Sequence, residues 1–236
     1  MRKAIEQKLN SYKFLNPKSA DFKNWVAESN VWMFVYSSLL VSGREVSKQD
    51  LVHALGGEII PDFSVSLYME IQKLAELFED MKSCLAMQHS IDTKILARWA
   101  EILFGSSEYR SSNAAIFKWG IIPCRFLEID EHLGEVFKAA RGMECIDKAI
   151  YLHNEINRIY PFGKNSPEIA LAAMYYTLMQ GGYPMPTISV FQAEYDDMMQ
   201  GYYKSKSEEF ALMTERIILD RLEQIVQIAL SCGDRQ

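Results

Sequence analysis

The chain has 236 residues, of which 49% are hydrophobic and 24% are charged, and its formal net charge at pH 7 is −6. This length and composition are typical of one globular domain with a substantial core. Lysine and arginine are scattered among acidic residues and form no basic block that could neutralise phosphates. The sequence therefore argues against a nucleic acid as the main partner.

The four cysteines, Cys84, Cys124, Cys145 and Cys232, lie far apart and form no Cys-x-x-Cys pair. We therefore expect reduced, packed thiols rather than a disulfide framework or a zinc site. The N-terminus has no apolar signal region, and the longest strongly apolar run, residues 31–36, is too short to span a bilayer. These features predict a cytoplasmic protein with no membrane partner, although export as an effector by a specialised system would leave no readable signal.

The chain reads as a series of helices separated by short loops. The expected helices cover residues 20–41, 47–55, 64–87, 92–104, 145–160 and 167–180, followed by a last helix after capping-box spacing from Ser205 to Glu208. Residues 114–122 are the best strand or hairpin candidate, and residues 167–180 are apolar nearly all round, as in a buried central helix. The sequence predicts an all-α protein with one small hairpin, divided into an N-terminal helical segment (1–60) and a single compact core (61–236).

The segment from Ile159 to Glu168 reads Ile-Tyr-Pro-Phe-Gly-Lys-Asn-Ser-Pro-Glu; Leu152-His153 precedes it and Gly182-Tyr183-Pro184 follows it. It resembles the signature of the Fic (Fido-fold) nucleotide-transferase family. That signature reads Ile-His-Pro-Phe, two variable residues of which the second is acidic, then Gly-Asn-Gly-Arg, with another Arg three residues later. The resemblance, which covers roughly residues 25–201, implies a Fido-like helical core with a flap.

Most of the chemical groups of that signature are replaced. The Pro-Phe pair is kept as Pro161 and Phe162, whereas Tyr160 stands at the position of the base His and Lys164 at that of the metal-holding carboxylate. The remaining positions are held by Asn165, Ser166 and Pro167 in place of Gly-Asn-Gly, and by Glu168 and Leu171 in place of the two arginines.

Two further segments are similar to parts of that family. Residues Ser38 to Gly43 resemble an inhibitory motif, Ser-x-x-x-Glu-Gly, whose Glu pairs with the second signature Arg at the γ-phosphate site. Here Ser42 stands at the Glu position, so both partners of that ion pair are missing. Tyr109-Arg110, followed by residues 117–123, resembles the flap, a hairpin that aligns a target protein through main-chain pairing.

The substituted groups are poorly suited to the family's reaction. An unperturbed Tyr has a pKa of about 10, so only about one molecule in a thousand is phenolate at pH 7. We expect Tyr160 to be a packed aromatic with its hydroxyl hydrogen-bonded nearby, the other interpretation being a base activated by Lys164. Lys164 repels a divalent cation. It is expected to be a surface lysine, or else a direct point-charge contact to phosphate without metal.

The residues after Lys164 favour a helix start over an anion site. Ser166 suits an N-cap, Pro167 suits the first helical position and removes one N–H group, and Glu168 suits the positive end of the helix dipole. His153 lies on the apolar face of its helix and is expected to be a core histidine with satisfied hydrogen bonds. No histidine has a partner at metal-ligand spacing, so no metal site is predicted.

The flap-like segment carries two aromatic residues, Phe117 and Trp119, on either side of Lys118. Strand alternation predicts that both rings point to the same face. They would then form either an exposed anchor for a partner or a pair packed on the core.

The leading hypothesis is a catalytically inactive Fic-like pseudoenzyme that binds a partner protein, as a regulatory module, through its flap and the adjacent cleft. It needs no cofactor. One alternative is a nucleotidyl (AMP) or related phospho-group transferase that modifies a target-protein hydroxyl by non-standard chemistry, with ATP and Mg²⁺, and acts as a secreted effector. Another is a helical scaffold whose likeness is only ancestral. The partner and the oligomeric state are not predicted.

Overall fold

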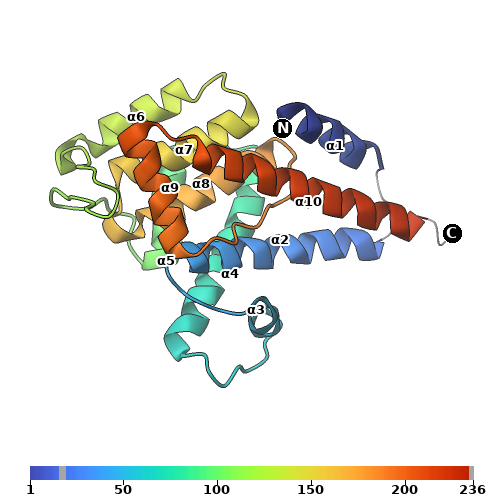
Figure 1. The fold of residues 1–236 in the computed structure, drawn as a ribbon. Helices are drawn as coiled ribbons and strands as arrows, with labels where there is room; N and C mark the ends of the chain where they lie inside the picture. Colours follow the sequence, from blue (N-terminus) through green and yellow to red (C-terminus); the bar gives the residue numbers. More distant parts are fainter. Residues whose placement is uncertain (16–19, 234–236) are drawn as a thin grey trace.

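The computed structural model describes residues 1–15 and 20–233, with side chains for residues 1–14 and 22–231. This part of the chain contains ten α-helices, labelled in Figure 1: α1 (Arg2–Leu15), α2 (Ala20–Val41), α3 (Lys48–Leu55), α4 (Val65–Ala86), α5 (Thr93–Phe104), α6 (Ile129–Ala139), α7 (Cys145–Ile159), α8 (Ser166–Gln180), α9 (Gln192–Ser205) and α10 (Glu209–Gly233). Two 3₁₀ turns, η1 (Phe126–Glu128) and η2 (Gly163–Asn165), precede α6 and α8. The all-α prediction is confirmed.

Helix α8 is the central element of the core, as its all-round apolar sequence predicted. It packs against α7, α2, α4 and α5, and its residues from Ile169 to Leu178 are buried. A helix that is apolar on every face can be surrounded by other helices without burying a charged side chain. The first turn of α8, which carries the signature-like residues, is consequently held in place by the whole bundle.

Three helices begin with a side-chain N-cap, at Ser47, Ser64 and Asp92. The Ser47 hydroxyl accepts the Asp50 N–H at the start of α3, and the Ser64 hydroxyl accepts the Leu67 N–H at the start of α4. The Asp92 carboxylate accepts the Ile95 N–H at the start of α5. Each cap satisfies one of the backbone donors that a helix start leaves free.

Three helices were not predicted, namely α1, α6 and α9. Helix α1 packs along α10 and buries Ile5 and Leu9 in the main core, so the N-terminal segment shares its core with the rest of the chain. The expected capping box at Ser205 was wrong. Ser205 lies in the last turn of α9, where its hydroxyl donates to the Gly201 carbonyl, and it is Ser207 that accepts the Glu209 N–H.

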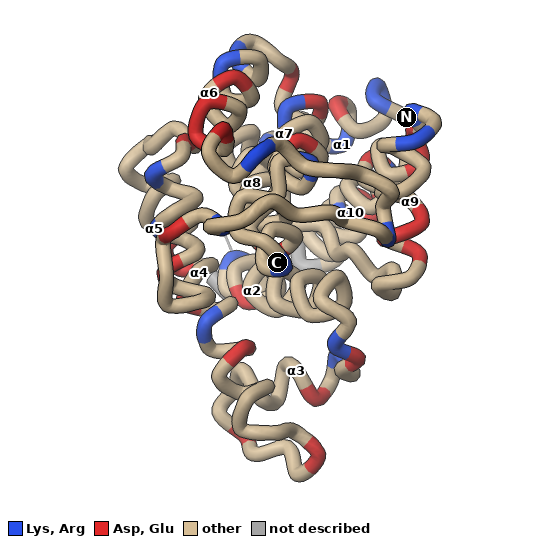
Figure 2. The backbone as a smooth tube through the Cα atoms, turned by 90° about the vertical axis from the view of Figure 1, so that its left-hand side faces the viewer, with Lys and Arg blue, Asp and Glu red and all other residues tan. Residues whose placement is uncertain are grey.

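The outer parts of the molecule differ in character. Both views show α3 and the loop that follows it projecting from the main body, and Figure 2 shows charges of both signs distributed over the outer helices.

None of the helices within residues 1–15 and 20–233 is long and apolar enough to cross a membrane. Of the cysteines, Cys84 is buried while Cys124 and Cys145 are half-buried, and all three are free thiols; the side chain of Cys232 lies outside the described residues.

Candidate functional site

The turn between α7 and α8 places the signature-like residues. Helix α7 ends at Ile159. Tyr160 caps it in the left-handed conformation (φ 57°, ψ 51°) and donates its N–H to the Ile156 carbonyl at 2.9 Å. A bulky residue seldom adopts this conformation without tertiary support. The reversal leads the chain through Pro161 and Phe162, both buried, into η2 and then directly into α8.

Three backbone N–H groups of this turn are hydrogen-bonded within the turn itself. Gly163 donates to the Tyr160 carbonyl and Asn165 to the Phe162 carbonyl, each at 3.3 Å. Ser166 donates its N–H to the Gly163 carbonyl, and Pro167 has no N–H group. Donors that already have partners are not free to hold a phosphate.

Ser166 does not act as the expected N-cap of α8. Its backbone is already helical (φ −66°, ψ −34°), because η2 runs into α8 without a break. Its buried hydroxyl instead accepts the Phe162 N–H at 3.0 Å, across the base of the turn. This bond uses the remaining donor of the Pro-Phe pair and fixes the shape of the loop.

The Tyr160 side chain is half-buried against the core. Its hydroxyl makes no hydrogen bond within the described part of the chain, so the expected hydroxyl partner is absent there. Burial and the nearby Glu168 carboxylate raise the pKa of Tyr160 above 10. The phenol is therefore a weaker source of phenolate than an unperturbed tyrosine.

A cleft of about 520 Å³ lies beside this turn, between the ends of α2 and α4, the flap and the start of α8. Four of its lining residues are basic (Arg44, Lys73, Lys118 and Lys164) and two are acidic (Glu70 and Glu168). Arg44 pairs with Glu70 at 3.2 Å, Lys118 pairs with Asp196 at 2.7 Å, and the Lys73 ammonium donates to the Leu103 carbonyl.

Lys164 is exposed, and it has no ion pair or hydrogen-bond partner among the residues described. It lies at the rim of the cleft on η2, as a surface lysine would. The other interpretation, in which Lys164 contacts a phosphate directly, would need backbone donors beside it. The N–H groups of Gly163, Asn165 and Ser166 already have partners within the turn.

Glu168, in the first turn of α8, is joined to the end of α2. The Ser42 hydroxyl donates to Glu168 Oε1 at 2.6 Å and also lies 2.8 Å from the Ser38 carbonyl oxygen. Glu168 Oε2 is buried and has no hydrogen-bond partner, and burial raises the pKa of this carboxyl above its ordinary value. Leu171 is fully buried one turn further along α8, so no polar group replaces the second arginine.

The flap is anchored to the signature-like turn by Arg110, a contact that the sequence did not predict. The Arg110 backbone N–H donates to the Pro161 carbonyl at 2.8 Å, and its Nε donates to the Tyr160 carbonyl at 3.0 Å. The same guanidinium donates to the carbonyls of Ser112 and Cys124, at the two ends of the flap. One side chain therefore closes the flap and holds it against the turn.

The flap itself is a tight turn with a single antiparallel bridge between Ile116 and Ile121. Phe117 is 91% exposed, whereas Trp119 is 0% exposed. The prediction that both rings share a face was wrong, because residues 117–120 form the turn and strand alternation does not apply within it. The Trp119 Nε1 donates to the Asp196 carboxylate at 2.8 Å, the same carboxylate that pairs with Lys118, and so docks the flap on α9.

Comparison with known proteins gives matches to solved structures. The structure superposes on a Fic-domain-containing signalling protein from Bacteroides thetaiotaomicron with a TM-score of 0.82 and 15% identity, over 97% of this chain and 98% of that one. Fic-1 (residues 134–508) from C. elegans gives a TM-score of 0.72 at 14% identity over 99% of this chain and 73% of that one. A Fic family protein from Desulfovibrio desulfuricans gives a TM-score of 0.65 at 14% identity, over 99% and 75%.

The chain has the Fic (Fido) fold. No family model and no curated relative matches the sequence, and identities of 14–16% to the structural neighbours establish the fold alone. The Fido-like fold that the resemblance of residues 159–168 and their flanking segments implied is thereby confirmed.

His153 is a core histidine in this Fic fold, as expected. It is fully buried, stacks on Phe210 at 4.3 Å between ring centroids, and hydrogen-bonds Asn154 and the Tyr195 hydroxyl through its two ring nitrogens. Burial lowers its pKa to about 4, so the ring is neutral near pH 7. Its position behind the turn makes it a structural residue.

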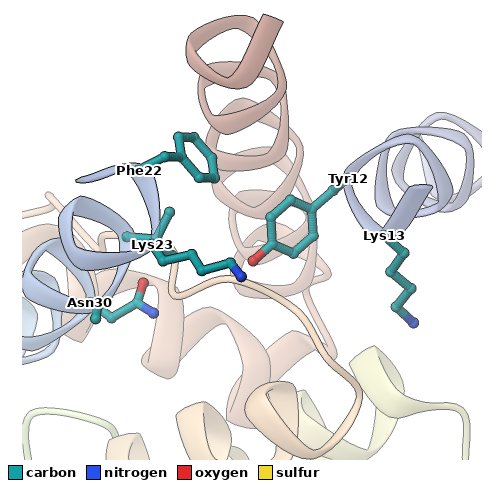
Figure 3. Close-up of a pocket in the computed structure, with 7 residues that line it drawn as sticks. Tyr12, Lys13, Phe22, Lys23 and Asn30 are labelled. Carbon is teal, nitrogen blue, oxygen red and sulfur yellow. The ribbon is translucent and has the colours of Figure 1, made fainter. Parts of the chain in front are cut away.

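Two other features of the molecule bear on cofactors. No group of three or more His, Cys, Asp or Glu side chains able to hold a metal occurs among the described residues. A pocket of about 420 Å³ between α1 and α2 is lined by Tyr12, Lys13, Phe22, Lys23 and Asn30 among others. Figure 3 shows the Tyr12 hydroxyl directed toward the Lys23 ammonium. This pocket contains none of the signature-like residues.

Proposed function

We propose that this protein is a catalytically inactive Fic-like module that binds a partner protein through its flap. The observation that carries the proposal is the internal hydrogen bonding of the turn from Tyr160 to Pro167. Phosphate sites at helix starts work by presenting free N–H groups, and here those of Phe162, Gly163, Asn165 and Ser166 are already bonded.

The charged groups of the cleft support the same proposal. Glu168 places a carboxyl group where a triphosphate would need a cation, and Lys164 places a cation where a metal would need a carboxylate. The raised pKa of Tyr160 opposes its use as a base. Base, metal ligand and anion site are all changed, so we propose a protein that requires neither ATP nor Mg²⁺.

The flap supports the partner-binding part of the proposal. Phe117 and Ile122 are 91% and 85% exposed, although the turn that bears them is held by Arg110 and Trp119. Large apolar side chains on a preorganised turn suit an interface anchor, because little conformational freedom is lost on binding. We propose a protein partner, rather than a nucleic acid or a membrane, in the cytoplasm.

Two measurements test the two halves of the proposal. Calorimetric titration with ATP and Mg²⁺ is expected to give no binding; a micromolar dissociation constant would restore the alternative of a transferase with non-standard chemistry. Cross-linking capture from cell lysate, compared between wild type and Phe117→Ser, is expected to lose its specific partners in the variant. The matched control is Ile59→Ser, which removes an equally exposed side chain (87%) from the loop before α4. Equal capture by wild type and both variants would contradict partner binding at the flap and favour the alternative of a helical scaffold whose likeness is only ancestral.

A further inference from the structure

The floor of the cleft contains an unused hydrogen-bonding group. Glu168 Oε1 is held by Ser42, whereas Glu168 Oε2 is enclosed and has no partner. A buried carboxyl oxygen without a hydrogen-bond donor destabilises the folded state, and more strongly if the group is charged. Such a group is retained at a cost to stability unless something else supplies a donor.

A small pocket adjoins this carboxyl. It has a volume of about 40 Å³ and is lined by Glu70, Lys73, Leu74, Leu103, Phe104 and Glu168. All of these except Leu74 also line the larger cleft, so the pocket is an extension of the cleft floor. Its size suits one ammonium or methyl-sized group. Its walls combine two carboxyl groups, apolar carbon and the Lys73 side chain, whose ammonium is bonded to the Leu103 carbonyl.

The cations around this pocket are engaged elsewhere, with one exception. Lys118 is paired with Asp196, Arg44 is paired with Glu70, and the Lys73 ammonium donates to a backbone carbonyl. Only Lys164 is without a partner among the described residues that line the cleft and bear positive charge. It lies about one helical turn before Glu168, so the cleft presents a free acceptor at its floor and a free cation at its rim.

We propose that the cleft binds a small ligand that carries a protonated amine at one end and a carboxylate at the other. The amine enters the small pocket and donates to Glu168 Oε2, its methylene chain packs on Leu103 and Phe104, and its carboxylate meets Lys164. The floor of this cleft would bind a cation, whereas the floor of a phosphate site binds an anion, because the group at the floor is the Glu168 carboxyl. The ligand site does not include Phe117 or Ile122, the exposed flap residues proposed for partner binding.

The test uses three probes of equal chain length on the full protein: 5-aminopentanoate, pentylamine and pentanoate. Calorimetry and thermal unfolding are expected to show binding of 5-aminopentanoate, weaker binding of pentylamine and none of pentanoate. Lys164→Gln should reduce 5-aminopentanoate binding to the level of pentylamine. Glu168→Gln keeps an acceptor for Ser42 and should weaken binding about tenfold or more, the effect of losing one charge-assisted hydrogen bond.

A second variant guards against misfolding of Glu168→Gln. Ser42→Ala leaves the carboxyl in place and frees its other oxygen, so it should bind 5-aminopentanoate at least as tightly as wild type. Three results would each overturn the proposal: no binding of 5-aminopentanoate below about 10 mM, binding of pentanoate or inorganic phosphate as tight as that of 5-aminopentanoate, or equal affinity of wild type and a folded Glu168→Gln variant.

Discussion

Ser42 and Glu168, 126 residues apart in the chain, share a hydrogen bond of 2.6 Å. Ser42 lies just past the end of α2 and Glu168 in the first turn of α8, so the bond joins two elements that enclose the cleft. The bond satisfies one carboxyl oxygen and leaves the other enclosed without a donor. The junction between these segments is therefore polar and only half satisfied.

The carboxyl group of Glu168 should make the protein less stable as the pH rises. Burial raises the pKa of this carboxyl in the folded state above the ordinary 4.5. Its contribution to the free energy of unfolding is therefore greatest below pH 4.5 and is lost as the pH rises through the pKa of the folded state. Glu168→Gln is permanently neutral and should be more stable than wild type at pH 8, by ~1–3 kcal/mol. Urea unfolding at pH 4 and pH 8 measures this; the matched control Glu70→Gln, at the partly exposed Arg44 pair, should show no such gain.

His153 should produce the opposite slope at acid pH. Its pKa is lowered from 6.5 to about 4 by burial, so the unfolded chain binds a proton more readily than the folded protein between these values. Stability should therefore fall as pH drops from 6.5 to 4, by about 3 kcal/mol for this group. A His153→Gln variant should be less stable at pH 7 and show a shallower slope in this range. An unchanged slope would mean that the ring is not neutral and enclosed.

Restoring a histidine at the end of α7 should not restore catalysis. Tyr160→His supplies a base, but the amide groups of Phe162, Gly163, Asn165 and Ser166 stay hydrogen-bonded. Lys164 still stands at the position of the metal carboxylate, and Glu168 and Leu171 at those of the two arginines. Groups that act as a unit are strongly non-additive. Transfer of radiolabel from ATP to the protein or to a lysate should stay at background. Labelling by this single variant would show that the anion site is more competent than its hydrogen bonding indicates.

The two flap aromatics should separate stability from recognition. Trp119 is fully buried and hydrogen-bonded to Asp196, so Trp119→Ala should destabilise by ~3–5 kcal/mol. Phe117 is exposed, and Phe117→Ala should change the free energy of unfolding by less than about 0.5 kcal/mol. Chemical denaturation of each single variant measures both values. A large loss of stability in Phe117→Ala would show that the ring packs on the protein in solution.

Local sequence was sufficient for much of the helical architecture. Helices α2, α3, α4, α5, α7 and α8 were predicted from apolar periodicity, and Ser47, Ser64 and Asp92 marked three of their starts. These signals succeed because a helix buries one stripe and needs a cap within three residues of its start, both of which are local properties. The burial of His153 followed for the same reason, from its place on the apolar face of α7.

What depended on contacts between distant segments could not be predicted in this way. The Ser42–Glu168 bond, the anchoring of Arg110 to the carbonyls of the turn and the docking of Trp119 on Asp196 each join residues at least 49 positions apart. The opposite exposures of Phe117 and Trp119 follow from a four-residue turn placed against α9, which alternation along the chain cannot express. Most of the helices, though not α1, α6 and α9, and the chemical groups around the turn could be read from the sequence. Which of those groups found partners was set by tertiary packing, because a partner depends on position in space.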